Sequence, residues 1–226
     1  MQFQLHSFAE SGHSYKVALA LHFAKADWEQ VFIDFFRGET RSEAYKKEIN
    51  SMAEVPVLQD GDKKISQSGA ILDYLHGKTG HYFGTNEEER VEILRWVLWD
   101  NSRLSGSLGP TRFLMNFISE DKRPFEVIDY LQKRNNAALA VLENHLADQK
   151  WIAADQLSAA DLSCCSYLFY PENFGFDRKS HPNIDRWLSN IEAYENWKHP
   201  YDSVSYTHLR AHETEADLVC RLLLEK

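Results

Sequence analysis

Hydrophobic and polar residues alternate at the amino terminus and then change to a helical spacing. Phe3 and Leu5 stand between polar neighbours, which predicts a first strand over residues 2–8. Apolar residues then recur at the i, i+3, i+4 and i+7 positions of a helix, at Val17, Ala20, Leu21 and Ala24. The apolar run 31–35 predicts a second strand, parallel to the first because strand–helix–strand crossovers are almost always right-handed. Residues 37–50 are polar, and we expect them to be partly helical.

Two short apolar runs follow, with an Asp-Gly turn between them. The first run begins at Val55, the turn lies at residues 60–61, and Ser68 opens another stretch of helical periodicity. This order predicts strand, hairpin, strand and helix. Pro56 cannot donate to a strand ladder, so we expect it where the strand begins, after a cis peptide bond to Val55.

The change of periodicity divides the chain into an α/β part and an all-helical part. A strand–helix–strand unit followed by a hairpin and a helix is typical of a thioredoxin-like domain, which we assign to residues 2–77, with its last helix ending near Gly77. Residues 78–85 are expected to form a linker. Only helical spacing recurs over residues 86–203, which predicts an all-α carboxy-terminal domain.

Helix boundary signals are frequent in the second domain. Asn86 precedes three glutamates and predicts a helix start. Gly106, Gly109 and Pro110 predict a break, and Pro124 begins another helix. Ser158 and Asp161 have the spacing of a capping box. Buried helix faces are predicted at Leu139, Leu142 and Leu146, and at Ile184, Trp187, Leu188 and Ile191.

The carboxy-terminal residues 204–226 differ in character from the rest of the chain. They resemble in-frame translations of sequencing-adapter DNA, and we expect a non-native tail. The alternative is a genuine carboxy-terminal helix.

Composition and charge narrow the class of protein. A net charge of −9 argues against a general binder of nucleic acid or anionic membrane. The chain has no run of eighteen apolar residues and no secretory leader pattern, so a cytoplasmic protein is expected. Its three cysteines include no Cys-x-x-Cys pair, Cys164 and Cys165 are expected to be packing groups, and no metal is expected because the histidines lack ligand spacing.

Candidate chemistry lies in two segments that precede predicted helices. Ser11 and Ser14 place hydroxyls at the start of the first helix, where a hydroxyl and the positive helix end can stabilise a thiolate. Helix capping is the alternative role for both serines. Gln67 and Ser68 supply amide, hydroxyl and N–H donors at the head of a later helix, which suit a carboxylate.

The order of these motifs resembles the glutathione-binding half of a cytosolic glutathione S-transferase of the serine-using theta and zeta kind. The resemblance rests on Ser11-Gly12-His13-Ser14, Val55-Pro56 and Gln67-Ser68, and it extends over about residues 2–202. It implies that Ser11 is the catalytic hydroxyl, that Val55 beside Pro56 pairs its backbone with the cysteinyl part of glutathione, and that Gln67 and Ser68 bind the γ-glutamyl carboxylate.

The sequence departs from the family pattern at three points. Tyr15 stands between the second serine and Lys16, Glu54 replaces a common glutamine, and Ala53 replaces a common glycine. Ser11 and Ser14 therefore both stay candidates for the thiolate-stabilising hydroxyl.

The resemblance also implies an activity, a co-substrate and an assembly. It implies a detoxification enzyme of the cytoplasm that forms a homodimer. Glutathione would be its co-substrate, and a small apolar electrophile would be its second substrate. The alternatives are a non-catalytic interaction module of the same fold, and a glutathione-dependent isomerase or peroxidase. A disulfide mechanism of the thioredoxin type lacks its nucleophile, because the first loop contains no cysteine. Candidates for the border of the electrophile pocket are Trp96, Trp99, Asn101, Arg103, Arg112 and Phe113.

Overall fold

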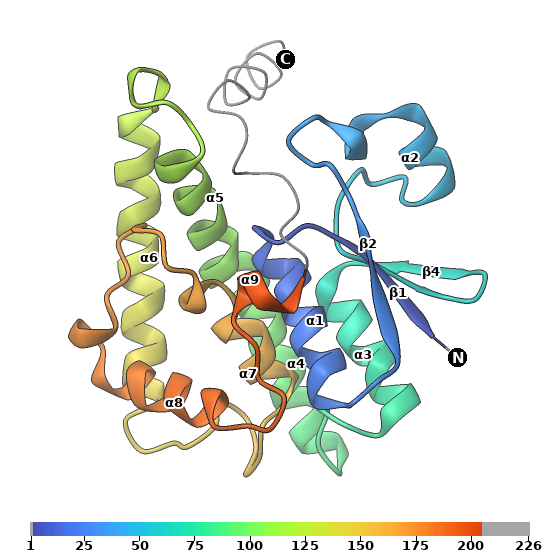
Figure 1. The fold of residues 1–226 in the computed structure, drawn as a ribbon. Coiled ribbons are helices and arrows are strands. Elements are labelled where there is room, and N and C mark those ends of the chain that lie inside the picture. The colour runs from blue at the N-terminus through green and yellow to red at the C-terminus, as the bar shows by residue number, and fades with distance from the viewer. Residues whose placement is uncertain (1, 205–226) are drawn as a thin grey trace.

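A mixed four-stranded sheet forms the centre of the amino-terminal part. The computed structural model describes residues 2–204, and its strands are β1 (Phe3–Ser7), β2 (Trp28–Phe32), β3 (Val57–Asp60) and β4 (Lys63–Ser66) (Figure 1). Their spatial order is β2-β1-β3-β4, with β1 parallel to β2 and antiparallel to β3. The predicted thioredoxin-like arrangement is confirmed. The predicted tail lies outside the described residues, apart from Val204.

The second strand begins and ends three residues earlier than predicted. Its register pairs Phe3 with Trp28 and Ser7 with Phe32, so it stops where β1 stops. The apolar residues after it have another use, because Phe35 stacks on Phe8 with ring centroids 4.6 Å apart. The apolar run therefore indicated a strand correctly, but only Ile33 in it is buried, and pairing with β1 sets the limits of the strand.

Helix α1 (Gly12–Phe23) is buried on all sides, although its predicted pattern was amphipathic. Every residue from Ser14 to Leu21 is buried. In Figure 1, α1 lies between the sheet and the helical part, and it packs against both α3 (Ser68–Thr79) and α7 (Ala159–Cys165). Contacts on both sides leave the helix with no solvent-facing surface along this stretch.

The remaining helices cover the sheet and build the helical part. Helix α3 ends two residues beyond the predicted position, because Gly80 rather than Gly77 takes the left-handed conformation that closes it, with φ of 74°. The other elements are α2 (Glu43–Glu48), α4 (Glu87–Trp99), α5 (Ser105–Asn116), α6 (Phe125–His145), α8 (Pro182–Glu192), α9 (Pro200–Ser203), and 3₁₀ turns at Glu39–Arg41, Glu120–Lys122, Ser166–Phe169 and Arg178–Ser180.

The predicted break at Pro110 is wrong. Helix α4 continues through a π-helical turn, Asp100–Leu104, directly into α5, and Pro110 lies inside α5. A proline removes one backbone hydrogen bond, but tertiary packing decides helix formation here, since Leu108 and Thr111 on either side of it are buried.

The predicted capping box is confirmed and joins three segments. The Asp161 carboxylate accepts hydrogen bonds from the backbone N–H and hydroxyl of Ser158, both at 2.8 Å. Its other oxygen accepts from the Ile152 N–H at 3.0 Å and the Trp187 indole at 2.9 Å. Burial raises the pKa of Asp161, while these donors oppose the rise. One side chain thus ties the start of α7 to α8 and to the loop before it.

The predicted buried faces and packing cysteines are found as expected. Leu139, Leu142 and Leu146 of the α6 end are buried, as are the four apolar residues predicted in α8. Cys164 and Cys165 are buried in α7, and burial raises the pKa of both thiols well above the ordinary value. None of the helices in the described part of the chain has the length and apolarity that crossing a membrane needs.

Candidate active site

A cavity of about 710 Å³ lies between the α/β part and the helical part. All five predicted site residues line it: Ser11, Val55, Pro56, Gln67 and Ser68. Two 12-residue helices, α1 and α3, begin beside Ser11 and Ser68, at the polar end of the cavity. Their first N–H groups have no partner inside the helix and carry partial positive charge, so this end favours an anion.

The two serines of the first motif have different environments. Ser11 is the N-cap of α1 and lines the cavity, and its Oγ accepts the N–H of Ser14 at 3.1 Å. That bond uses an oxygen lone pair and leaves the O–H group able to donate. Ser14 is fully buried behind the cavity wall, and its Oγ finds no partner among the described residues. Ser11 therefore performs the capping role and also presents a hydroxyl to the cavity.

The start of α3 is strained and is held in place by the opposite loop. Gln67, the N-cap, has φ of 68° and ψ of 112°, a conformation that costs free energy for any residue with a side chain. Its amide donates to the Glu54 carboxylate at 2.7 Å and lies 3.7 Å from the Met52 sulfur. Ser68, the first residue of α3, lies 3.3 Å from His13 through its Oγ. These contacts connect the start of α3 with the start of α1 and with the loop that contains Glu54.

The loop before the third strand contains the predicted cis peptide bond between Val55 and Pro56. The Glu54 carbonyl accepts hydrogen bonds from the Tyr45 hydroxyl at 2.8 Å and the Asn50 amide at 3.0 Å. Ala53 has φ of 57°, which explains why a glycine is common at this point of the family pattern. An alanine at this φ carries backbone strain that a glycine would avoid.

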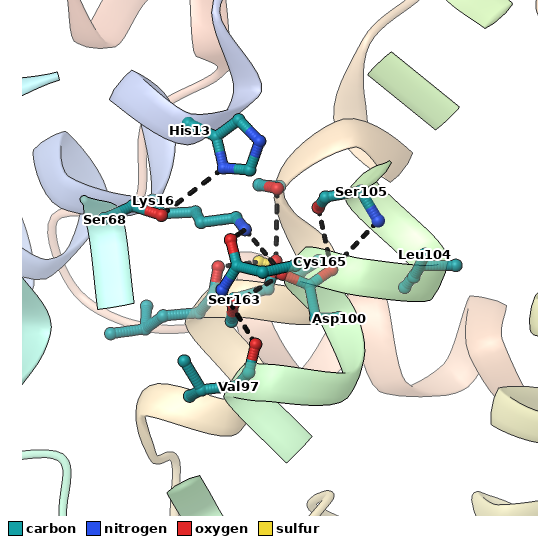
Figure 2. A network of polar contacts seen from close by, with 12 residues as sticks. His13, Lys16, Ser68, Val97, Asp100, Leu104, Ser105, Ser163 and Cys165 are labelled. Carbon is teal, nitrogen blue, oxygen red and sulfur yellow. Dashed lines mark hydrogen bonds and ion pairs between the residues drawn. The ribbon is translucent and has the colours of Figure 1, made fainter. Parts of the chain in front are cut away.

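A buried ion pair lies beneath the first turn of α1 (Figure 2). The Lys16 ammonium lies 2.5 Å from Asp100, and both side chains are fully buried. Asp100 also accepts from the N–H and hydroxyl of Ser105, at 3.2 and 2.7 Å, and from the Ser163 hydroxyl at 2.6 Å. A buried charge pair is tolerated only when its remaining valences are satisfied in this way. The π-helical turn places Asp100 at this point and so connects α1 with α5 and α7.

His13 is neutral at neutral pH. Burial lowers its pKa well below 6.5, and the nearby Lys16 charge lowers it further. A neutral imidazole beside Ser68 is a hydrogen-bonding group and adds no positive charge to the cavity.

Three cavity residues carry features that sequence reasoning missed or placed incompletely. Arg112 of α5 is buried, and its guanidinium donates to the Glu10 carbonyl at 2.8 Å and to Glu172 at 2.8 Å. It therefore fixes the residue next to Ser11. Arg41 is an exposed cation on the cavity wall, and Tyr167 is a buried phenol there. No local motif marks these residues, because folding alone brings them to the cavity.

Five phenylalanine rings line the apolar wall of the cavity. The Phe36 and Phe117 rings, one from each part of the chain, lie 5.5 Å apart. Of the candidates for the pocket border, Asn101, Arg112 and Phe113 line the cavity, whereas Trp96, Trp99 and Arg103 do not. Among residues 2–204, no group of three or more His, Cys, Asp or Glu side chains is arranged to hold a metal ion.

Two family models match the chain. The glutathione S-transferase amino-terminal domain matches residues 1–77, and the glutathione S-transferase carboxy-terminal domain matches residues 111–195. The matches cover each of the two parts between which the cavity lies.

Curated proteins and solved structures agree with these matches. The chain is 26% identical to the disulfide-bond oxidoreductase YfcG of Escherichia coli, over 82% of this chain and 88% of that protein. It is 27% identical to glutathione S-transferase theta-2 of Rattus norvegicus, over 72% and 69% respectively. A glutathione S-transferase structure from Pseudomonas fluorescens superposes with a TM-score of 0.81 at 25% identity, over 88% of this chain and 99% of that one. The chain belongs to the glutathione S-transferase family.

Proposed function

We propose that this protein is a glutathione transferase that joins the glutathione sulfur to small apolar electrophiles. The observation that carries the proposal is one cavity in which the starts of α1 and α3 meet an aromatic wall. The polar end suits a small anionic peptide, and the aromatic end suits an apolar second substrate.

The polar side chains offer a partner for each part of glutathione. The Ser68 hydroxyl and the Gln67 amide would bind the γ-glutamyl carboxylate at the positive end of α3, and Glu54 beside them would accept its ammonium group. The Val55 backbone would pair with the cysteinyl residue. Arg41 supplies a cation for the glycyl carboxylate.

Ser11 would stabilise the reacting sulfur. A free thiol has a pKa near 8.5, so only a few per cent is thiolate at neutral pH. A hydroxyl that donates to the sulfur at the positive end of α1 favours the anion without reacting itself. The thiol proton passes to solvent, and an electron pair of the thiolate sulfur forms the bond to the electrophilic carbon. The leaving group departs with the electron pair of its broken bond to that carbon.

The test combines retention on immobilised glutathione with a conjugation assay. Wild type should be retained and should conjugate, and Ser11→Ala should lower the rate about tenfold or more at neutral pH, since a hydrogen bond to a charged group contributes roughly 1.5–3 kcal/mol. Ser14→Ala is the matched control, because its hydroxyl lies behind the wall. Equal rates for wild type and Ser11→Ala would refute the serine assignment.

The same assay separates the alternatives. A non-catalytic module would show no glutathione-dependent turnover. Turnover of a peroxide, an isomerisable substrate or a mixed disulfide in place of conjugation would keep the glutathione site and replace the reaction. The disulfide arm is included because a relative carries that activity in its name.

An exposed apolar stripe supports the predicted homodimer. Val91, Leu94 and Leu98 of α4 are 60%, 43% and 62% exposed and follow the i, i+3, i+7 spacing of one helix face. A second copy would cover this face. Two further points stay predictions. One is the division of the chain into residues 2–77, 78–85 and 86–203, which limited proteolysis can test, and the other is a cytoplasmic location.

A further inference from the structure

Tyr167 is a buried phenol on the cavity wall to which the proposed reaction assigns no role. It belongs to the 3₁₀ turn Ser166–Phe169, which follows α7 in the helical part, and it is 8% exposed. Its ring nevertheless reaches the first turn of α1, where it meets the His13 ring edge-to-face at 5.8 Å between centroids.

Two glycines, one from each part of the chain, make the slot for this ring. A Cβ atom on Gly12 would lie 2.6 Å from the Cζ and Cε2 atoms of Tyr167. A Cβ atom on Gly109 would lie 2.8 Å from its hydroxyl oxygen. Contacts this short do not occur in packed proteins, so any side chain at either position would displace the phenol. The ring is therefore held in one orientation, with its hydroxyl between α1 and α5.

The hydroxyl keeps its proton at neutral pH. Burial raises the pKa of Tyr167 to about 12, against the opposing effects of the Arg112 charge and of the backbone N–H groups of Gly12 and His13. A protonated phenol keeps its O–H group as a hydrogen-bond donor. A protonated phenol in this place cannot act as a base, but it can stabilise an anion.

We propose that Tyr167 donates a second hydrogen bond to the glutathione sulfur, so that the thiolate lies between the Ser11 hydroxyl and a phenol from the helical part. The inference rests on the proposed function and adds a catalytic residue to it. The ring packs against Gly12 in the first turn of α1, so its O–H group would act on the anion together with the positive end of that helix.

The decisive measurement is the pKa of the glutathione thiol in the binary complex, followed by the ultraviolet absorbance of the thiolate. Tyr167→Phe should raise this pKa by about one unit, which corresponds to a tenfold change in the ionisation equilibrium. Glutathione affinity measured below the thiol pKa should change little, because the neutral thiol gains little from the bond. Ser11→Ala with Tyr167→Phe should raise the pKa further than either change alone.

Tyr82→Phe is the matched control. Tyr82 is also 8% exposed, its hydroxyl donates to the Ala20 carbonyl at 2.6 Å, and it does not line the cavity. Its loss should leave the thiol pKa unchanged. Gly109→Ala tests the same inference with the phenol present, and it should also raise the thiol pKa because the new methyl group displaces the hydroxyl.

The outcomes separate this inference from the proposed function. If wild type does not bind glutathione, both fall. If wild type lowers the thiol pKa and Tyr167→Phe lowers it equally, only this inference falls. The inference also falls if that variant keeps the lowered thiol pKa and loses turnover solely with oxygen-bearing electrophiles, since the phenol would then serve the second substrate.

Discussion

The buried pair of Lys16 and Asp100 makes a quantitative prediction about stability. Replacing Lys16 with methionine keeps the apolar stem but leaves the Asp100 carboxylate without its cation. The donors from Ser105 and Ser163 remain, so the carboxylate stays hydrogen-bonded but its charge is no longer balanced. Breaking a buried pair in this way costs about 3–5 kcal/mol.

The expected cost is large enough to measure by thermal unfolding. In a chain of this length, each kcal/mol shifts the midpoint by roughly 2–4 °C, so Lys16→Met should lower Tm by on the order of 10 °C. Adding Asp100→Asn should recover part of the loss, because the amide keeps partners and carries no charge. Lys25→Met is the control, since Lys25 pairs with Glu195 at 2.8 Å with side chains 63% and 78% exposed. Its Tm should stay close to that of wild type.

Two results would refute the reasoning. A Lys16→Met variant as stable as Lys25→Met would mean that water or local rearrangement compensates the charge. A double variant no more stable than Lys16→Met would mean that lost packing, and not the unbalanced carboxylate of Asp100, causes the destabilisation.

Three further predictions concern binding, pH and assembly. Glu54→Gln should weaken glutathione binding several-fold, because it removes a charge-assisted bond to the ammonium group, and calorimetry showing unchanged affinity would contradict this. Because the pKa of His13 is lowered well below 6.5 in the fold, the unfolded chain binds the extra proton first, so stability should fall as pH drops below about 6.5. His13→Asn should make this fall shallower in denaturation curves at pH 7 and 5 than in wild type. Leu98→Asp should convert the proposed dimer to a monomer in sedimentation, whereas Val141→Asp at an exposed position of α6 should not.

Local patterns in the sequence determined much of the fold and the position of the candidate site. The hairpin, whose turn lies at residues 61–62 and so one position later than predicted, the cis bond before Pro56 and the capping box of Ser158 and Asp161 all depend on neighbouring residues, so the sequence is sufficient to predict them closely. The five predicted site residues share one cavity because each begins or precedes an element whose place in the thioredoxin-like arrangement is known.

Only the tertiary structure decided which distant residues meet. Lys16 and Asp100 are 84 residues apart in the chain, and Arg112 lies 102 residues from the Glu10 carbonyl that it holds. The continuous α4–α5 helix across Pro110, and the slot that two glycines make for Tyr167, likewise depend on contacts between the two parts. The local sequence determines hydrogen bonds and backbone propensities within a few residues. Burial and charge pairing between distant residues arise only when the two parts pack together.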